Sequence, residues 1–327
     1  MKELALTFGP EQGLVGVVAV AEAAEAGVRG SGFGVQGLGA RPRSERGNLD
    51  GGKERLAGGS PSSSDKKANS PKPGVVFWNA GLLHRVGASR LYVTLARELA
   101  AQGFASLRFD LSGRGDSAPP KGVLPERVRA IEEIQEAMRV LGERAGVNRF
   151  VLVGLCTGAD QAHAVAVADA RVVGLVCVDG YAYPTWGFWV RRVGGILLNR
   201  RRLGGVVRRL VRAGGGGDGF QVSGVRFQGG ADGDIAGLFD WQFPPRGQVR
   251  ADLEALAGRG AQMLYLYSGE AAAVFNHRAQ FKNMFPGANF GDKVTVAFME
   301  DADHLFALPG DRARFVRVVG DWFAGRF

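Results

Sequence analysis

The chain has 327 residues, of which 46% are hydrophobic, and it carries a formal net charge of +9 with only two cysteines. This length can bury one large core, and so few cysteines exclude a disulfide-stapled secreted scaffold. The basic excess comes without interleaved stacking aromatics or a nucleic-acid motif, so we expect no nucleic-acid partner. The two cysteines give no metal-ligand spacing, and we expect neither a metal nor another cofactor.

The sequence predicts a cytoplasmic protein without a transmembrane segment. Its first apolar runs, residues 4–8 and 14–21, are too short for a signal peptide. Nowhere does it contain the roughly 18 consecutive apolar residues that a transmembrane helix needs. The low cysteine count is typical of a reducing compartment.

The first 72 residues divide into two parts. Residues 1–21 contain two short apolar runs joined by a turn-rich Gly-Pro-Glu-Gln-Gly pentapeptide, which predicts a β-hairpin belonging to the core. Residues 22–72 are dominated by glycine, serine, alanine and charged residues, with almost no large apolar side chains after residue 35. This composition predicts a disordered insertion.

From residue 73 onward, β-type apolar runs alternate with amphipathic helical patterns, which is typical of a parallel sheet covered by helices on both faces. We therefore predict an α/β fold with an eight-stranded, mostly parallel sheet, built from residues 73–180 and 246–327. Strands are predicted at 74–78, 105–109, 150–153, 172–178, 263–267 and 294–298, and helices at 89–102, 125–145, 159–168, 249–256, 277–284 and 311–323.

A nucleophile elbow is indicated where the strand at 150–153 runs into residues 154–158, Gly-Leu-Cys-Thr-Gly, and then into a helix. So tight a turn needs small residues two before and two after its central residue. The central side chain then stands above the C-terminal edge of the sheet, at a helix N-terminus that favours the reactive thiolate. We therefore interpret Cys156 as a nucleophile, and Cys177, inside an apolar strand, as core packing.

This elbow and two further segments resemble the α/β-hydrolase superfamily, over residues 74–327 and the opening hairpin. Residues 75–83 match its strand and small-residue loop, and residues 108–117 contain its Asp-x-x-Gly-x-Gly-x-Ser stretch, usually a structural loop. The loops are similar to those of the serine-aminopeptidase-like branch and of hydrolases associated with exosortase and exopolysaccharide loci. A cysteine nucleophile is similar to that of dienelactone hydrolases and polyhydroxyalkanoate synthases. The resemblance implies a bacterial hydrolase or acyl-transfer enzyme.

The loop after the first strand of this unit departs from the superfamily pattern, because Asn-Ala at 79–80 stands where a His-Gly pair is usual. The resemblance implies that a backbone N–H of this loop and the N–H after the nucleophile bind the oxyanion. Gly81 and Thr157 take those positions, with Leu82 as the alternative loop donor. His84, in the same loop, is a candidate contact with substrate.

His304 is the candidate base, because it lies on the loop after the strand at 294–298, where the superfamily places its histidine. The other three histidines occupy different places. His84 lies in the oxyanion loop, His163 on the helix after the elbow, and His277 at the start of a later helix.

Two carboxylates are candidates for the acid of the site. The superfamily usually places it after the glycine that ends strand seven, but three alanines at 271–273 occupy that place. Glu270 is adjacent, and Asp179 follows strand six, where some lipases of the superfamily carry their acid. Because a thiol ionises far more easily than a hydroxyl, a Cys–His dyad is a third alternative.

Residues 181–245 fit none of the repeats and predict a lid over the sheet. Aromatic, aliphatic and arginine side chains alternate there at roughly helical spacing. One interpretation is an amphipathic cap whose guanidinium groups, Arg191 and Arg192 among them, bind an anionic acyl carrier, a phosphate or a membrane surface. The other is a solvated basic face.

The sequence therefore predicts an acyl hydrolase, either an esterase or a thioesterase, that works through an acyl-cysteine intermediate. Its substrate would be a small-molecule or carrier-linked acyl group, and its lid would allow peripheral membrane contact. An acyltransferase with the same nucleophile and a non-catalytic binding protein with this fold are the two alternatives.

Overall fold

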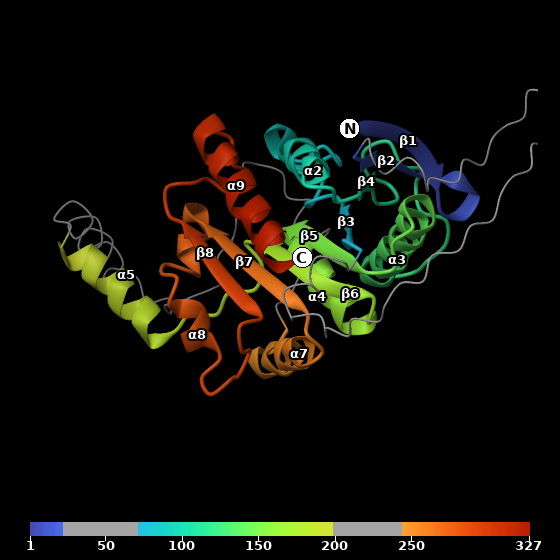
Figure 1. Cartoon of the computed structure of the whole chain (residues 1–327). Helices are drawn as coiled ribbons and strands as arrows, with labels where there is room; N and C mark the ends of the chain where they lie inside the picture. Colours follow the sequence, from blue (N-terminus) through green and yellow to red (C-terminus); the bar gives the residue numbers. More distant parts are fainter. Residues whose placement is uncertain (22–70, 199–243) are drawn as a thin grey trace, which may run out of the picture.

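The computed structural model describes residues 1–21, 71–198 and 244–327. These residues form an eight-stranded sheet in the order β1-β2-β4-β3-β5-β6-β7-β8 (Figure 1). β2 runs antiparallel to β1 and β4, and the strands from β4 to β8 are parallel. The predicted fold class is thus confirmed. The strands are β1 (Lys2–Phe8), β2 (Leu14–Val20), β3 (Gly74–Phe77), β4 (Ser106–Asp110), β5 (Phe150–Leu155), β6 (Val172–Val178), β7 (Gln262–Ser268) and β8 (Val294–Met299).

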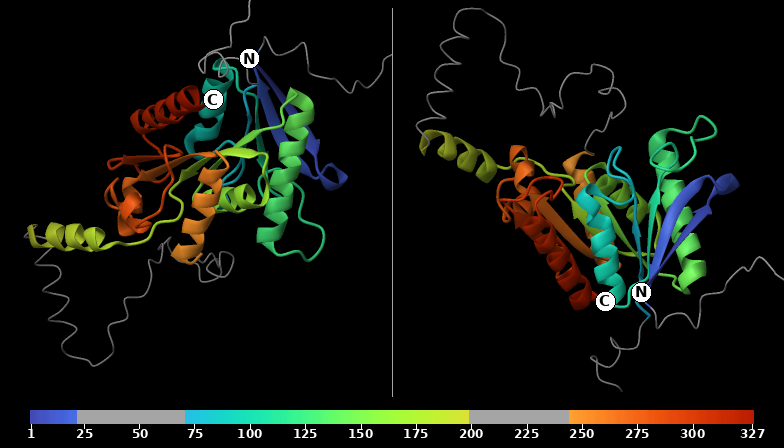
Figure 2. Two further views of the ribbon diagram at one scale, coloured as in Figure 1. Left: turned by 60° about the horizontal axis from the view of Figure 1, so that its bottom comes forward. Right: turned by 90° about the horizontal axis from the view of Figure 1, so that it is seen from above.

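Helices cover both faces of this sheet. On one face α2 packs against α9, and on the other α3 and α7 flank α4 (Figure 2). The helices are α2 (Leu91–Ala101), α3 (Glu126–Ala145), α4 (Thr157–Ala168), α5 (Trp186–Leu198), α7 (Arg246–Gly258), α8 (Gln280–Met284) and α9 (Pro309–Arg326), with 3₁₀ turns at Pro10–Gln12, Ala88–Arg90 and Gly269–Ala273.

The core lies on both sides of the central strands. All six residues of β5 are buried, as expected of a parallel strand covered by helices on both faces. Each face has its own cluster of buried apolar side chains, one beneath α3, α4 and α7 and one beneath α2 and α9. This rigid sheet presents the loops at its C-terminal edge.

Two predicted helices begin later than the sequence indicated. The helix expected at 89–102 starts as a 3₁₀ turn, because Ser89 and Arg90 have φ values of 48° and 64°, and α2 begins only at Leu91. The helix expected at 277–284 begins at Gln280, after Nδ1 of His277 accepts the N–H of Ala279 at 3.1 Å. For these first residues the prediction was wrong.

Two predicted segments fall mostly outside the described residues. The insertion expected at 22–72 does so except for residues 71 and 72, and the lid expected at 181–245 does so over 199–243. The described part of the lid forms α5, which extends away from the body of the molecule (Figures 1 and 2). Among the described residues, no helix combines the length and hydropathy that crossing a bilayer requires.

Candidate active site

Cys156 lies between the last residue of β5 and the first residue of α4, with φ 56° and ψ −123°. A residue with a side chain seldom adopts such a conformation, so the surrounding structure must hold it. The Cys156 N–H donates to the carbonyl of Val178 at 2.8 Å, and the Cys156 carbonyl accepts from the N–H of Ala159 at 2.9 Å. A Cβ at Gly154 would lie 2.1 Å from the carbonyl oxygen of Gly158. The turn therefore requires glycine there.

Two of the loops at this edge bring a histidine and a carboxylate to the elbow. Asp179 follows β6 directly, and His304 lies on the loop after β8. Nδ1 of His304 is 2.6 Å from Oδ2 of Asp179, and the imidazole also hydrogen-bonds Cys156. Glu270 reaches only the backbone of His304, whose N–H donates to Oε2 at 3.1 Å. Of the two carboxylates considered from sequence, Asp179 is the one that contacts the imidazole.

Ser268, which the sequence analysis did not single out, holds Asp179 in place. Its N–H donates to Oδ1 of Asp179 at 2.7 Å, and its hydroxyl donates to Oδ2 at 2.7 Å. Ser268 is fully buried at the end of β7, beside β6. Its position at the end of β7, just before a glycine, was the signal in the sequence. Both oxygens of Asp179 are thus satisfied before His304 is counted.

The imidazole of His304 favours its charged form. Burial of the ring opposes the charge, but hydrogen bonds to Asp179 and Cys156, and the negative charges of both, more than offset it. Together they raise the pKa of His304 from 6.5 to about 10. The protonated ring is thus favoured where it lies between a carboxylate and a sulfur.

We expect His304 to stabilise the fold most below its unfolded pKa of about 6.5. This stabilisation should fade as the pH rises through its folded pKa of about 10, because neither state then binds the proton. Urea denaturation of the wild type and of His304→Gln checks this. The wild type should exceed the variant in free energy of unfolding by more at about pH 6 than at about pH 10. A difference that grows with pH would contradict the expectation.

The two predicted oxyanion donors, Gly81 and Thr157, lie in contact. The N–H of Gly81 donates to Oγ1 of Thr157 at 3.0 Å, so a side chain rather than open space faces this N–H. Gly81 has φ 57°, and nothing lies within 4 Å of where its Cβ would be. The backbone of the loop is therefore joined to the N-terminus of α4, and the oxyanion role of both residues stays a prediction.

The same loop is fixed to the sheet by a buried amide and a buried carboxylate. Nδ2 of Asn79 donates to Oδ1 of Asp110 at 2.8 Å, and Oδ1 of Asn79 accepts the N–H of Leu111 at 2.6 Å. Asp110 also accepts the N–H of Arg85 at 2.7 Å. A Cβ at Gly115 would lie 2.3 Å from the Asp110 carboxylate. Asn79, which replaces the usual histidine, thus serves to anchor the loop.

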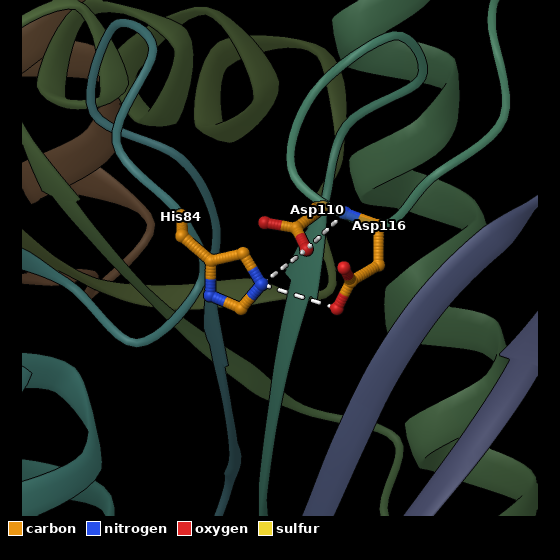
Figure 3. A group of neighbouring side chains, drawn as sticks. All are labelled: His84, Asp110 and Asp116. Atoms are coloured by element: carbon orange, nitrogen blue, oxygen red, sulfur yellow. Dashed lines mark hydrogen bonds and ion pairs between the residues drawn. The ribbon is translucent and has the colours of Figure 1, made fainter.

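His84, Asp110 and Asp116 offer ligand-type atoms within 4.8 Å of one another (Figure 3). Nε2 of His84 lies 3.3 Å from Oδ2 of Asp110 and 3.2 Å from Oδ2 of Asp116. Nη1 of Arg85 bonds Asp110 and lies 2.7 Å from Asp116 and 2.9 Å from Nε2 of His84. A guanidinium cation therefore already pairs with both carboxylates, and the cluster is an ion-pair network. Contact of His84 with substrate stays a prediction.

Arg191 and Arg192 fasten α5 to the loop after β7. Nε of Arg191 donates to Oδ1 of Asn276 at 2.9 Å, and Nη1 of Arg192 donates to the carbonyl of Ala273 at 3.5 Å. The Arg192 guanidinium also lies 5.8 Å from the ring centroid of Phe188. Contact of Arg191 and Arg192 with substrate stays a prediction.

Two other candidate residues serve packing. Nε2 of His163 is 3.0 Å from Oδ2 of Asp252, which joins α4 to α7, and burial lowers the pKa of this histidine. Cys177 is buried within β6, and burial raises the pKa of its thiol. A neutral buried thiol is a poor nucleophile.

Residues 75–203 match the model of a family described as serine aminopeptidase, S33. Among solved structures, a hypothetical protein of Pseudomonas aeruginosa is 15% identical with a TM-score of 0.50, over 100% of this chain and 94% of that one. A putative hydrolase of Agrobacterium vitis is 15% identical with a TM-score of 0.49, over 98% of both chains. A serine hydrolase homologue of Coxiella burnetii is 13% identical with a TM-score of 0.49, over 98% of this chain and 97% of that one. No curated protein matches.

The family match includes most of β3, the loop at Gly81, the elbow and Asp179, and it ends at residue 203, five residues past the described end of α5. The strand order, with one antiparallel hairpin before a parallel run, is consistent with the same fold over the described residues. Both findings agree with the tight turn at Cys156 between β5 and α4. The described residues therefore have an α/β-hydrolase fold, and residues 75–203 are similar to the family described as serine aminopeptidase, S33.

Proposed function

We propose that the chain is an acyl hydrolase that cleaves an ester or thioester of a small-molecule or carrier-linked acyl group through an acyl-Cys156 intermediate. The observation that carries the proposal is the unbroken series of contacts from Asp179 to His304 to Cys156. The family match supports a hydrolase. Esters and thioesters are favoured over amides because their leaving groups need less help from a proton donor.

Acylation starts from the ion pair. In the proposed step the Cys156 sulfur attacks the carbonyl carbon as a thiolate that is paired with the imidazolium of His304. A C–S bond forms while the carbonyl electron pair moves onto oxygen, where the N–H groups of Thr157 and of Gly81 or Leu82 stabilise the charge. The pair then returns, the bond to the leaving oxygen or sulfur breaks, and that atom takes the proton of His304.

Deacylation uses the same groups in reverse. His304 is now neutral, and no thiolate remains beside it to hold a proton. The imidazole removes a proton from water as the water oxygen bonds to the acyl carbon, and the second tetrahedral intermediate expels the Cys156 sulfur as a thiolate. Free acid departs and the ion pair is restored. Asp179 orients the ring through Nδ1 and stabilises its positive charge.

Two alternative functions have less support. The alternative of a non-catalytic protein rests on the open identity of the acid and on the unusual Asn-Ala pair at 79–80. Asp179 now offers a carboxylate to His304, and Asn79 has an anchoring role. An acyltransferase would form the same intermediate and pass it to an alcohol or amine, so release of free acid in the absence of any acceptor distinguishes hydrolysis from transfer.

Intact-mass spectrometry tests the intermediate directly. Protein mixed with p-nitrophenyl esters of rising chain length and quenched in acid should gain one acyl group, and peptide mapping should locate it on Cys156. Cys177→Ala serves as the control and should acylate like the wild type, since Cys177 is buried. Acylation elsewhere, or an equal adduct on Cys156→Ala, would rule the proposal out.

Ser268 should act as a positioning residue for Asp179. Ser268→Ala removes one hydrogen bond to the carboxylate, and we expect kcat to fall about tenfold with little change in KM. Ser268→Thr, which keeps the hydroxyl, should recover much of the loss. Ser106→Ala is the matched control, because Ser106 is also fully buried but its hydroxyl has no hydrogen-bond partner among the described residues. An equal loss in both alanine variants would mean that Ser268 contributes only to packing.

A further inference from the structure

α5 presents an apolar face that stays exposed. Trp186, Trp189, Val190 and Val193 follow the i, i+3, i+4, i+7 spacing that puts side chains on one side of a helix. Their exposed fractions are 83%, 45%, 53% and 50%. Two exposed tryptophans beside two exposed valines form a contiguous patch, and such patches mark interaction surfaces. We call these four residues the α5 face.

The other side of α5 is fixed to the body of the molecule. Phe188 is fully buried, and its carbonyl accepts Nδ2 of Asn276 at 3.1 Å. Arg191 bonds the same asparagine, and Arg192 reaches the preceding part of this loop. These contacts keep the α5 face directed outward, and the helix extends away from the sheet (Figures 1 and 2).

Further exposed apolar side chains lie at the C-terminal edge of the sheet, where the chain enters α5. Leu82 follows β3, and Leu305 and Leu308 follow β8, all three with large exposed fractions. The chain leaves β6 at this edge to enter α5, because the C-terminal ends of parallel strands lie together. The edge that carries Cys156 is therefore also the edge rich in exposed apolar groups.

The charge of the chain is concentrated in the same stretch of sequence. Residues 181–217 contain eight arginines and no aspartate, glutamate or lysine, whereas the whole chain has a net charge of +9. An anionic partner is therefore favoured. A second copy of the chain is disfavoured, because two chains that each carry a net charge of +9 repel each other.

We propose that the α5 face docks on an anionic membrane surface. Tryptophan side chains prefer the boundary between headgroups and acyl chains, and the valines add apolar area beside them. A basic chain with arginines on this helix, Arg191 and Arg192, is attracted to anionic lipids. Docking is peripheral and would bring the Cys156 edge of the sheet near lipid-borne acyl groups. The binding step does not depend on the acyl-cysteine chemistry.

Vesicle binding by the full chain tests this inference. Phosphatidylcholine vesicles containing phosphatidylglycerol should bind the protein at least tenfold more tightly than pure phosphatidylcholine vesicles, and high salt should remove most of this preference. Trp186→Ser/Trp189→Ser should weaken binding about tenfold or more. Val123→Ser/Leu124→Ser is the matched control, because both residues are exposed apolar side chains outside α5. Its binding should equal that of the wild type.

A second readout locates the contact. Lipids brominated near the headgroups should quench the fluorescence of Trp186 and Trp189, and the quenching should disappear in the double serine variant. Cys156→Ala should bind vesicles like the wild type, so a failure of catalysis and a failure of docking can be told apart. The inference is overturned if the protein does not bind the vesicles, or if the control variant loses as much binding as the double serine variant. It is also overturned if the protein forms a dimer instead of binding vesicles and the double serine variant abolishes that dimer.

Discussion

Cys156→Ala is expected to lower kcat/KM for a p-nitrophenyl ester by about three orders of magnitude or more, since removing a covalent nucleophile leaves only binding and oxyanion stabilisation. The fold should persist. The removed sulfur is only partly buried, and alanine fits the space around residue 156. Steady-state rates, with circular dichroism to check folding, measure the effect.

Two further variants sharpen this result. Cys177→Ala should leave the rate near that of the wild type, because that thiol is buried in β6 away from the contacts of His304. Cys156→Ser should be slow, because a hydroxyl beside an imidazolium does not ionise as a thiol does. If Cys177→Ala lost activity while Cys156→Ala kept it, the assignment of the nucleophile would be wrong.

The order of strands and helices could be predicted because the hydrophobic patterns are long and distinct. β5 and β6 are unbroken apolar runs, and the glycines at 154 and 158 indicate the sharp turn between β5 and α4. These signals are local and depend on few neighbours. Helix starts were less predictable. The positive φ values at Ser89 and Arg90 delay α2 although neither residue is a glycine.

The identity of the acid could not be predicted, because both candidate carboxylates end neighbouring strands of the sheet. The two carboxylates differ in the direction of their side chains. Asp179 has φ 48°, which turns its side chain toward Nδ1 of His304, and Ser268 holds it there. Glu270 lies in the 3₁₀ turn Gly269–Ala273, and its Oε2 accepts a backbone N–H. Side-chain direction of this kind depends on contacts between distant residues, which a single sequence does not show.

The hydrogen bonds of the oxyanion loop could not be predicted from the sequence either. Its glycine was predicted from spacing, but the hydrogen bond from Gly81 to the Thr157 hydroxyl depends on how the loop packs against α4. Because this N–H already has an acceptor, an oxyanion must either share it, displace the hydroxyl, or use the N–H of Leu82. The position of the loop is set in turn by the buried Asn79–Asp110 pair.

Asp179→Asn is expected to lower kcat by about 100-fold, whereas Glu270→Gln should change it by less than about threefold. An amide at 179 removes the negative charge beside the imidazole and can present a donor to Nδ1, which favours the wrong tautomer. A glutamine at 270 still offers an oxygen to the N–H of His304. The two substitutions are matched, since each replaces one carboxylate by an amide of the same shape.

A pH profile separates this electrostatic role from a structural one. Asp179→Asn should lower the pKa of His304 below its value of about 10, because a hydrogen bond and a negative charge that raise it are both lost. Titration of the imidazole by NMR in both variants measures this, and Glu270→Gln should leave the pKa unchanged. A large loss of kcat in Glu270→Gln alone would transfer the acid role to Glu270. Near-normal rates in both variants would show that Cys156 and His304 act as a dyad, because neither carboxylate would then be needed to orient the imidazole.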